Sequence, residues 1–163
     1  LLPGNIFDLD LGTETFTNST ASDQDFTSSI FTVPANAIFT NKGYRVTFDF
    51  EIISGVSAVT LIVYMKLGST KVYAHPAIDF TNSLTRSGSF QINFMGRAAA
   101  GAAAAVHTMP VLPAINANAM NTIDQPVNLA TNGTLAITPG VTYSGTGGTE
   151  SIQLLGWKVE ELY

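Results

Sequence analysis

Residues 44–53 read Y-R-V-T-F-D-F-E-I-I, and this stretch decides the fold class of the chain. Large apolar side chains occupy every second position from Tyr44 to Ile52, and the positions between them are polar or charged. Because successive side chains of a β-strand point to opposite faces of the sheet, the segment buries one face and leaves the other in water. This pattern indicates an antiparallel sheet with a single core-facing side.

The composition narrows the classes of protein that the chain can belong to. It has 163 residues, a net charge of −5 and only 12% charged residues. The acidic balance argues against nucleic acid as a partner, because phosphate contacts need a basic patch. No apolar run approaches the roughly 20 residues of a membrane-spanning helix. With no cysteine in the sequence, disulfides and thiolate chemistry are excluded.

Two segments differ in character along the chain. Residues 1–29 hold five of the twelve acidic residues, and we interpret them as an N-terminal acidic arm or docking segment. Residues 30–163 carry the alternating patterns and are expected to form one β-sandwich domain. The opening residues lack the basic and apolar regions of a signal peptide.

The remaining patterns extend the β interpretation. Residues 59–73 predict a hairpin that turns at Gly68, and residues 151–163 predict a closing strand that changes face at Gly156 through a β-bulge. Residues 77–89 are expected to form a connecting loop, 103–109 a strand, and 110–126 a long irregular loop. Strands with short turns and no helix predict an all-β antiparallel sandwich, as a jelly roll of about eight strands.

Candidate catalytic groups are few. His75 and His107 do not stand at a metal-ligand spacing, and no G-x-S-x-G motif accompanies the serines. Asp49 and Glu51 share a strand face and could act as a glycosidase carboxylate pair, but their alternation with Arg45 and Thr47 favours a solvated face. We therefore predict no catalytic residues and no enzymatic activity.

No metal or cofactor site is expected either. Asp8 and Asp10 offer two carboxylates, whereas calcium takes six or more oxygen ligands. Gly145, Gly147 and Gly148 form a turn rather than a phosphate-binding loop, because no lysine follows and no helix begins there.

Binding surfaces are predicted from apolar side chains on the solvent face. Ile62 and Tyr64 give strand 59–67 a second, partly apolar face, which favours contact with another subunit, although a covering loop of the same chain would produce the same pattern. Tyr73 and Tyr143 are weaker candidates for stacking on sugar rings.

With these strands placed, parts of the chain resemble β-sandwich domains of tailed-phage virion proteins. The resemblance rests on F-T-V-P-A-N-A-I at residues 31–38, the strand at 43–53, T-L-I-V-Y-M-K-L-G-S-T at 60–70 and S-I-Q-L-L-G-W-K-V-E-E-L at 151–162. Such domains serve as head decoration proteins, head fibres and tail fibres, commonly as trimers, and have no catalytic residues.

The leading hypothesis is a virion structural protein on the phage particle surface, a homotrimer that decorates the capsid or forms part of a fibre. Its expected partners are itself and other virion proteins, such as the major capsid protein or fibre and tail proteins. The alternative is a carbohydrate-binding receptor-recognition module at a fibre tip.

Overall fold

The computed structural model of the chain is all-β. It describes residues 6–9, 14–17, 20–27, 30–53, 55, 59–75, 77–79, 85–110, 127–146 and 148–162. The described residues form thirteen strands and no helix, and the named strands pair antiparallel. The prediction of an antiparallel all-β protein is confirmed.

The first sheet contains the two longest strands. Its pairing order is β1-β13-β5-β9-β10-β11, and β2 also pairs with β13. These strands are β1 (Ile6–Leu9), β2 (Glu14–Thr17), β5 (Gly43–Ile53), β9 (Thr85–Gly96), β10 (Ala104–Pro110), β11 (Val127–Leu129) and β13 (Ser151–Leu162).

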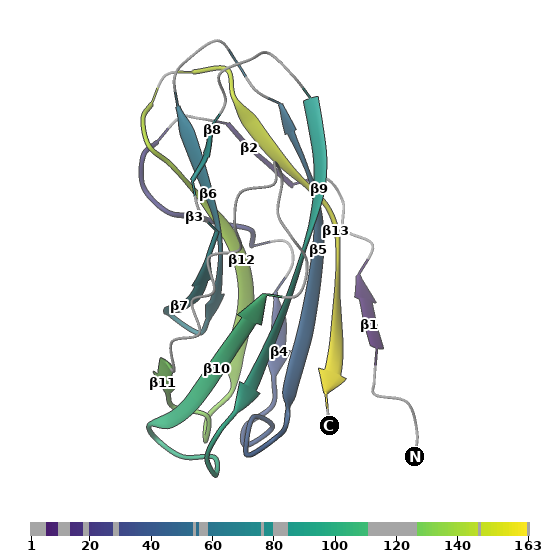
Figure 1. The fold of residues 1–163 in the computed structure, drawn as a ribbon, viewed down its shortest axis with the longest axis vertical. Helices are drawn as coiled ribbons and strands as arrows, with labels where there is room; N and C mark the ends of the chain where they lie inside the picture. Colours follow the sequence, from purple (N-terminus) through teal and green to yellow (C-terminus); the bar gives the residue numbers. More distant parts are fainter. Residues whose placement is uncertain are drawn as a thin grey trace.

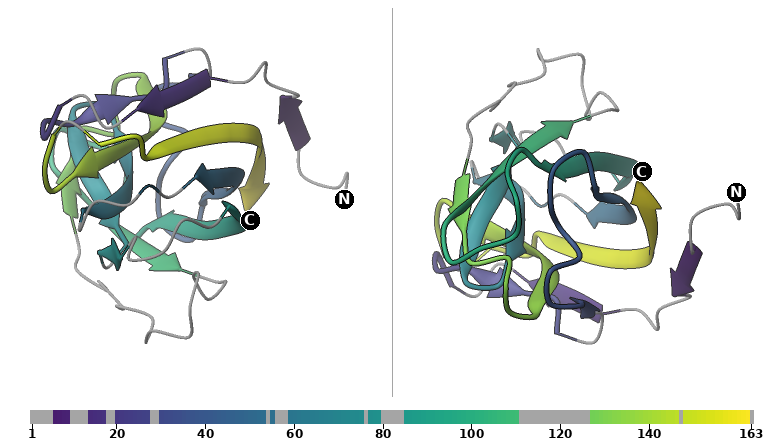
Figure 2. Two further views of the ribbon diagram at one scale, coloured as in Figure 1. Left: turned by 90° about the horizontal axis from the view of Figure 1, so that it is seen from above. Right: turned by 90° about the horizontal axis from the view of Figure 1, so that it is seen from below.

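The second sheet faces the first (Figure 1). Its pairing order is β3-β12-β6-β7, while β4 also pairs with β12 and β8 with β6. These strands are β3 (Gln24–Asp25), β4 (Phe31–Val33), β6 (Thr60–Leu67), β7 (Thr70–Ala74), β8 (Ile78–Asp79) and β12 (Leu135–Tyr143). Figure 2 shows the two layers end-on, with β1 at the outer margin of the molecule beside β13.

The chain passes between the sheets in a regular order. The first sheet contains the run β2-β13-β5-β9, and the second contains the run β4-β12-β6-β7. The last two long strands, β12 and β13, each enter the middle of a sheet between strands from earlier in the chain. We interpret this order as that of a jelly roll, a double-sheet fold made of two Greek keys.

The hydrophobic core lies between the sheets. Phe48, Phe50 and Phe90 of the first sheet are each 1% exposed, and Leu61 and Met65 of the second are fully buried. The rings of Phe50 and Phe90 stack with their centroids 4.9 Å apart. On β5 every second side chain from Tyr44 to Ile52 is buried, as the alternation predicts.

The closing strand contains the predicted bulge. The pairing of β13 with β5 shifts register between Leu154 and Gly156. At this point β13 contains one residue more than β5, because Leu155 has no partner in the pairing. Leu154 and Trp157 therefore both face the core, at 0% and 3% exposed. Leu155, between them, is 39% exposed and lies outside the core.

The loop predicted at residues 77–89 is wrong in part. Ile78–Asp79 form β8, and β9 begins at Thr85, so that Thr85–Ser89 pair with the end of β5. Residues 85–89 carry no large apolar side chain that would signal a strand, and Gly88 lies opposite Phe50, whose ring stacks on Phe90. The long loop predicted at 110–126 lies outside the described residues except Pro110, which ends β10.

The described parts of the N-terminal segment pair with both sheets. Strand β2 joins β13 of the first sheet, and β3 joins β12 of the second. Phe26 is 2% exposed and packs against Phe16 with the ring centroids 4.7 Å apart. Residues 24–25 show no apolar alternation that would predict a strand. Because the residues next to Phe26 are polar, β3 is recognised only by its pairing with β12.

Candidate functional site

The two carboxylates considered as a glycosidase pair lie on the solvent face of the first sheet. Asp49 is exposed and Glu51 half-buried on β5, opposite Ser89 and Ser87 of β9. On the same face Arg45 bonds to Asn93 at 3.0 Å and approaches Glu160 at 3.8 Å. The surroundings are those of a polar, solvated sheet face.

The two histidines lie on different strands, His75 at the end of β7 and His107 on β10. His75 is 5% exposed at the end of β7 and packs on the ring of Phe90, with 4.9 Å between the centroids. His107 is half-buried on β10, opposite Met95 of β9. Among the described residues, no three His, Cys, Asp or Glu side chains converge as metal ligands. Asp8 pairs with Lys158 along the backbone of β1 and β13, and Asp10 lies outside the described residues.

The residues predicted for a subunit interface have different environments. Ile62 is half-buried on the outer face of β6, opposite Thr142 of β12. Tyr64, on the same face, is fully buried by residues of its own chain. Tyr64 is thus covered by its own chain, which is the alternative to a subunit contact that the sequence left open. Only Ile62 remains as a predicted interface residue.

Tyr64 is the centre of a group of polar side chains on the outer face of the second sheet. Its ring lies against Gly140 of the neighbouring strand β12, and its hydroxyl donates to Asp25 at 2.6 Å. Above the ring, the Nζ atoms of Lys71 and Lys66 stand 4.2 and 5.1 Å from its centroid. A cation over a tyrosine ring is attracted by the negative face of the π system.

Two aspartates of the N-terminal segment pair with these lysines. Asp25 accepts from Lys66 at 2.8 Å, and Asp23 accepts from Lys71 at 2.6 Å. Asp23 also accepts from the hydroxyl of Thr142 at 2.7 Å. The resulting group, here named the Tyr64 cluster, links four neighbouring strands or their flanks: Asp23, Asp25, Tyr64, Lys66, Lys71 and Thr142.

The Tyr64 cluster perturbs its own ionisable groups. Burial raises the pKa of the Tyr64 hydroxyl, and the hydrogen bond to Asp25 with the charges of Asp25 and Asp23 raises it further. Desolvation also raises the pKa of Asp23, but bonds from Lys71 and Thr142 together with the lysine charges outweigh it, so this pKa lies below the ordinary 3.8. A deprotonated aspartate held by lysines is suited to fastening a segment, not to proton transfer.

The two tyrosines predicted to contact glycans are core residues in this structure. Tyr73 is 5% exposed and Tyr143 is 1% exposed. Burial raises the pKa of Tyr73 to about 12, and burial with the charge of Glu150 raises that of Tyr143. Tyr143 donates its hydroxyl to the carbonyl of Phe16 at 3.1 Å. Neither ring has a free face on which a sugar could stack.

Sequence reasoning missed the members of the Tyr64 cluster other than Tyr64 itself. Part of the signal was present, because Tyr64 and Lys66 share one face of the strand by alternation. The aspartates come from about 40 residues earlier in the chain, and only the pairing of β3 with β12 brings them next to β6.

Comparisons with known proteins give structural matches of low similarity. No protein-family model matches the sequence, and no curated protein matches it either. A structure of infectious bursal disease virus, Gt strain, aligns over 98% of the chain with a TM-score of 0.35 and 15% identity. The Gx strain structure gives 98%, 0.31 and 14%, and the crystal structure of the VP2 subviral particle of the same virus gives 93%, 0.31 and 15%. The chain spans about a third of the matched chains, at 33%, 34% and 33% of their lengths.

The described residues contain no helix that is long and apolar enough to cross a membrane.

Proposed function

We propose that the chain is a non-enzymatic structural protein of a virus particle, which self-assembles as a trimer and decorates a capsid or forms part of a fibre. The observation that carries this proposal is the strand order of the two sheets, β2-β13-β5-β9 against β4-β12-β6-β7. Double-sheet jelly rolls of this kind are widely used as capsid building blocks.

The sequence resemblance points the same way and narrows the proposal. The segments at 31–38, 43–53, 60–70 and 151–162 that resemble tailed-phage virion domains correspond to β4 with its following turn, β5, the β6–β7 hairpin and β13. Of these elements, β5 and β13 are central strands of the first sheet and β6 of the second, while β4 and β7 lie at sheet edges. A bacteriophage particle is therefore the source that we propose, with the major capsid protein or a fibre or tail protein as partner.

The polar side chains support a structural role. In the described part of the chain the ionic groups of the Tyr64 cluster fasten strands to one another. The carboxylates Asp49 and Glu51 stand on the outer sheet face, where Asp49 is exposed and Glu51 half-buried opposite the serines of β9. We therefore propose no enzymatic activity.

The outer face of the second sheet is the surface that we propose for self-association. Ile62 supplies a half-buried apolar side chain on the outer face of the second sheet. The low share of charged residues, 12%, also suits a surface that is partly covered in an assembly. The residues 1–29 remain our candidate for docking to a partner protein, although their described strands β2 and β3 also complete the sandwich.

The alternative is a receptor-binding module that binds sugars through tyrosines at its surface. Tyr73 and Tyr143 are both in the hydrophobic core. Tyrosine stacking therefore provides no support for a fibre-tip receptor module.

Light scattering coupled to size-exclusion chromatography tests the proposal directly. A mass of three chains is expected at micromolar concentration, and the purified protein should co-sediment with virus particles that lack it. A stable monomer that fails to bind any particle or virion protein would overturn the structural assignment. Trimers without particle binding would keep the assembly but reject decoration.

A further inference from the structure

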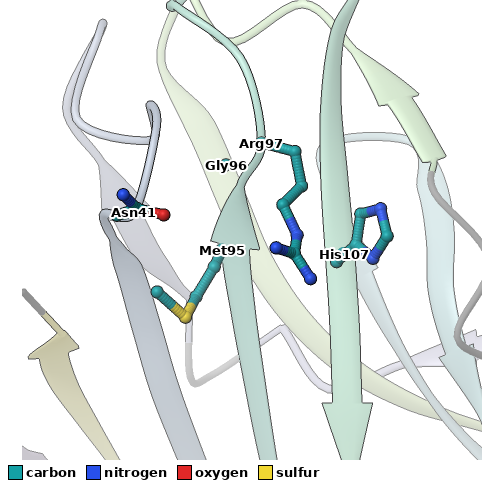
Figure 3. A pocket seen from close by; sticks show the side chains of 5 residues that line it. All are labelled: Asn41, Met95, Gly96, Arg97 and His107. Atoms are coloured by element: carbon teal, nitrogen blue, oxygen red, sulfur yellow. The ribbon is translucent and has the colours of Figure 1, made fainter.

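A small pocket opens at the end of the first sheet, where β9 ends and the turn before β5 passes beside it. It has a volume of about 110 Å³ and is lined by Asn41, Met95, Gly96, Arg97 and His107. Figure 3 shows the Arg97 side chain between those of Met95 and His107, with Asn41 on the neighbouring turn. The residues come from three segments that are distant in sequence, so the pocket exists only in the folded chain.

Backbone hydrogen bonds hold the walls of this pocket in place. The amide of Asn41 donates to the carbonyl of Gly96 at 3.0 Å, and the amide of Gly96 donates to Lys42 at 3.0 Å. The amide of Arg97 donates to Ala105 of β10 at 2.8 Å. A Cβ atom on Gly96 would lie 2.6 Å from the backbone of Phe39, so only glycine permits the close approach of the turn.

Arg97 differs from most other cations that the structure describes. Arg45, Lys66, Lys71 and Lys158 each stand within 4 Å of a carboxylate oxygen, at 3.8, 2.8, 2.6 and 3.0 Å. Within the described residues, no ion pair of Arg97 is found, and its side chain faces the pocket. In a chain with a net charge of −5, a guanidinium left without an acidic neighbour is available to an anion from outside.

The lining chemistry defines the kind of anion. A guanidinium offers paired N–H donors in a planar fork that matches the two oxygens of a carboxylate. The imidazole of His107 and the amide of Asn41 add polar atoms, and Met95 adds an apolar wall. A planar guanidinium beside an apolar wall suits a carboxylate that carries a short carbon body.

We propose that this pocket is a binding site for a carboxylate, which a small organic acid or an acidic sugar would supply. Arg97 binds the two carboxylate oxygens, His107 and Asn41 position the group, and Met95 contacts the carbon next to it. The volume of about 110 Å³ accommodates the carboxylate end of the ligand, and the rest of a larger molecule lies outside. The site is separate from Ile62 and from the Tyr64 cluster, so it stands or falls independently of the proposed function.

Nuclear magnetic resonance titration of the ¹⁵N-labelled full chain tests the site with three probes: acetate, N-acetylneuraminate and the methyl ester of N-acetylneuraminate. The backbone amides of Gly96, Arg97 and His107 should shift with acetate or with the free acidic sugar and stay in place with the uncharged ester. Tighter binding of the sugar acid than of acetate would identify an acidic sugar as the ligand. Equal binding of both would identify a simple organic acid.

Two variants complete the experiment. Arg97→Gln should weaken binding by about tenfold or more, because it removes a charge-assisted pair of hydrogen bonds. Lys158→Gln changes the net charge equally on the same sheet but away from the pocket, and it should bind as the wild type does. Equal shifts with the methyl ester, unchanged binding by Arg97→Gln or no response to either acid would each overturn the proposal.

Discussion

Gly140 lies opposite Tyr64 in the pairing of β12 with β6, and the tyrosine ring covers the glycine. A Cβ atom at position 140 would come within 2.5 Å of three atoms of that ring. The ring is fully buried and its hydroxyl is bonded to Asp25, so it has no free rotamer into which it could withdraw. The absence of a side chain at residue 140 is therefore required for the Tyr64 cluster to form.

This requirement predicts the effect of Gly140→Ala. The variant should lose about 1–3 kcal/mol of unfolding free energy, the usual range for overpacking a filled site. Urea unfolding followed by the fluorescence of the single tryptophan, Trp157, measures the loss. Gly133→Ala is the control, because a Cβ there meets nothing within 4 Å. In a Tyr64→Ala background the loss caused by Gly140→Ala should shrink, and strict additivity would contradict the contact.

The lowered pKa of Asp23 predicts how acid changes the stability that the Tyr64 cluster contributes. Its pKa is lower in the folded chain than its ordinary value of 3.8, so its ion pair stabilises the fold above that value and is lost as the pH falls through the folded pKa. Wild type should exceed Asp23→Asn in unfolding free energy at neutral pH by about 1 kcal/mol or less, because the pair is partly exposed.

The difference between the two proteins should then shrink as the pH falls below 3.8 and disappear once the wild-type aspartate is protonated as well. Urea unfolding at a series of pH values provides the measurement. Asp49→Asn, an exposed carboxylate on the opposite sheet, is the comparison variant. A wild-type advantage that stays constant down to the lowest pH would show that the Asp23 charge does not stabilise the fold.

At the scale of the element, β13 illustrates how one extra residue rearranges a strand. Ile152 and Leu154 face the core before the bulge, and Trp157 and Val159 face it afterwards. Without the register shift, the second pair would point into solvent, because the side-chain period of a strand is two. The bulge therefore keeps both halves of β13, which pairs with β5 along most of its length, on the same core.

Two neighbouring leucines test the position of the bulge. Leu154→Ala should cost about 2–5 kcal/mol, because its fully buried side chain would leave a cavity. Leu155→Ala should change the unfolding free energy by about 0.5 kcal/mol or less, since the side chain is 39% exposed. The two single variants are compared by urea unfolding. Similar losses for both would place the register shift elsewhere.

At the scale of the whole molecule, the two outer sheet faces differ. The outer face of the first sheet carries polar ladders such as Arg45 with Asn93 and Thr47 with Gln91. The outer face of the second sheet carries the Tyr64 cluster and, next to it, the half-buried Ile62. The first sheet exposes Ile53 and Leu155, at 43% and 39%, near one end of β5 and at the bulge of β13, whereas Ile62 lies beside the Tyr64 cluster. We choose the second sheet as the face to test for association of copies of the chain.

Ile62→Glu tests this choice. Introducing a charge there should shift the population from trimer to monomer by light scattering, because an unpaired charge in an interface is strongly unfavourable. Thr47→Glu places the same charge on the outer face of the first sheet and should leave the mass unchanged. Both variants must keep the unfolding midpoint of a folded sandwich. An unchanged trimer in Ile62→Glu would remove the second sheet as the interface.

The sequence by itself determined the fold class and most strand positions. The alternation at residues 44–53, the glycine turn at 68 and the change of face near Gly156 each reflect a local rule, and the corresponding strands β5, β6–β7 and β13 follow them. Local rules failed where a strand holds small or polar residues, as in β3 and at the start of β9, because those strands are defined by their partners.

Only the tertiary structure decided the sites. An outward position on a strand does not tell whether solvent, another subunit or the same chain covers the side chain. The hydroxyl of Tyr64 bonds to Asp25, 39 positions earlier, and Lys71 above its ring pairs with Asp23, 41 positions before Tyr64. The strand pattern likewise did not tell that Tyr73 and Tyr143 lie in the core. Arg97 and His107 meet because β9 and β10 pair, and Asn41 joins them through a turn from another part of the chain. Alternation reports one strand at a time, whereas a site depends on which strands become neighbours.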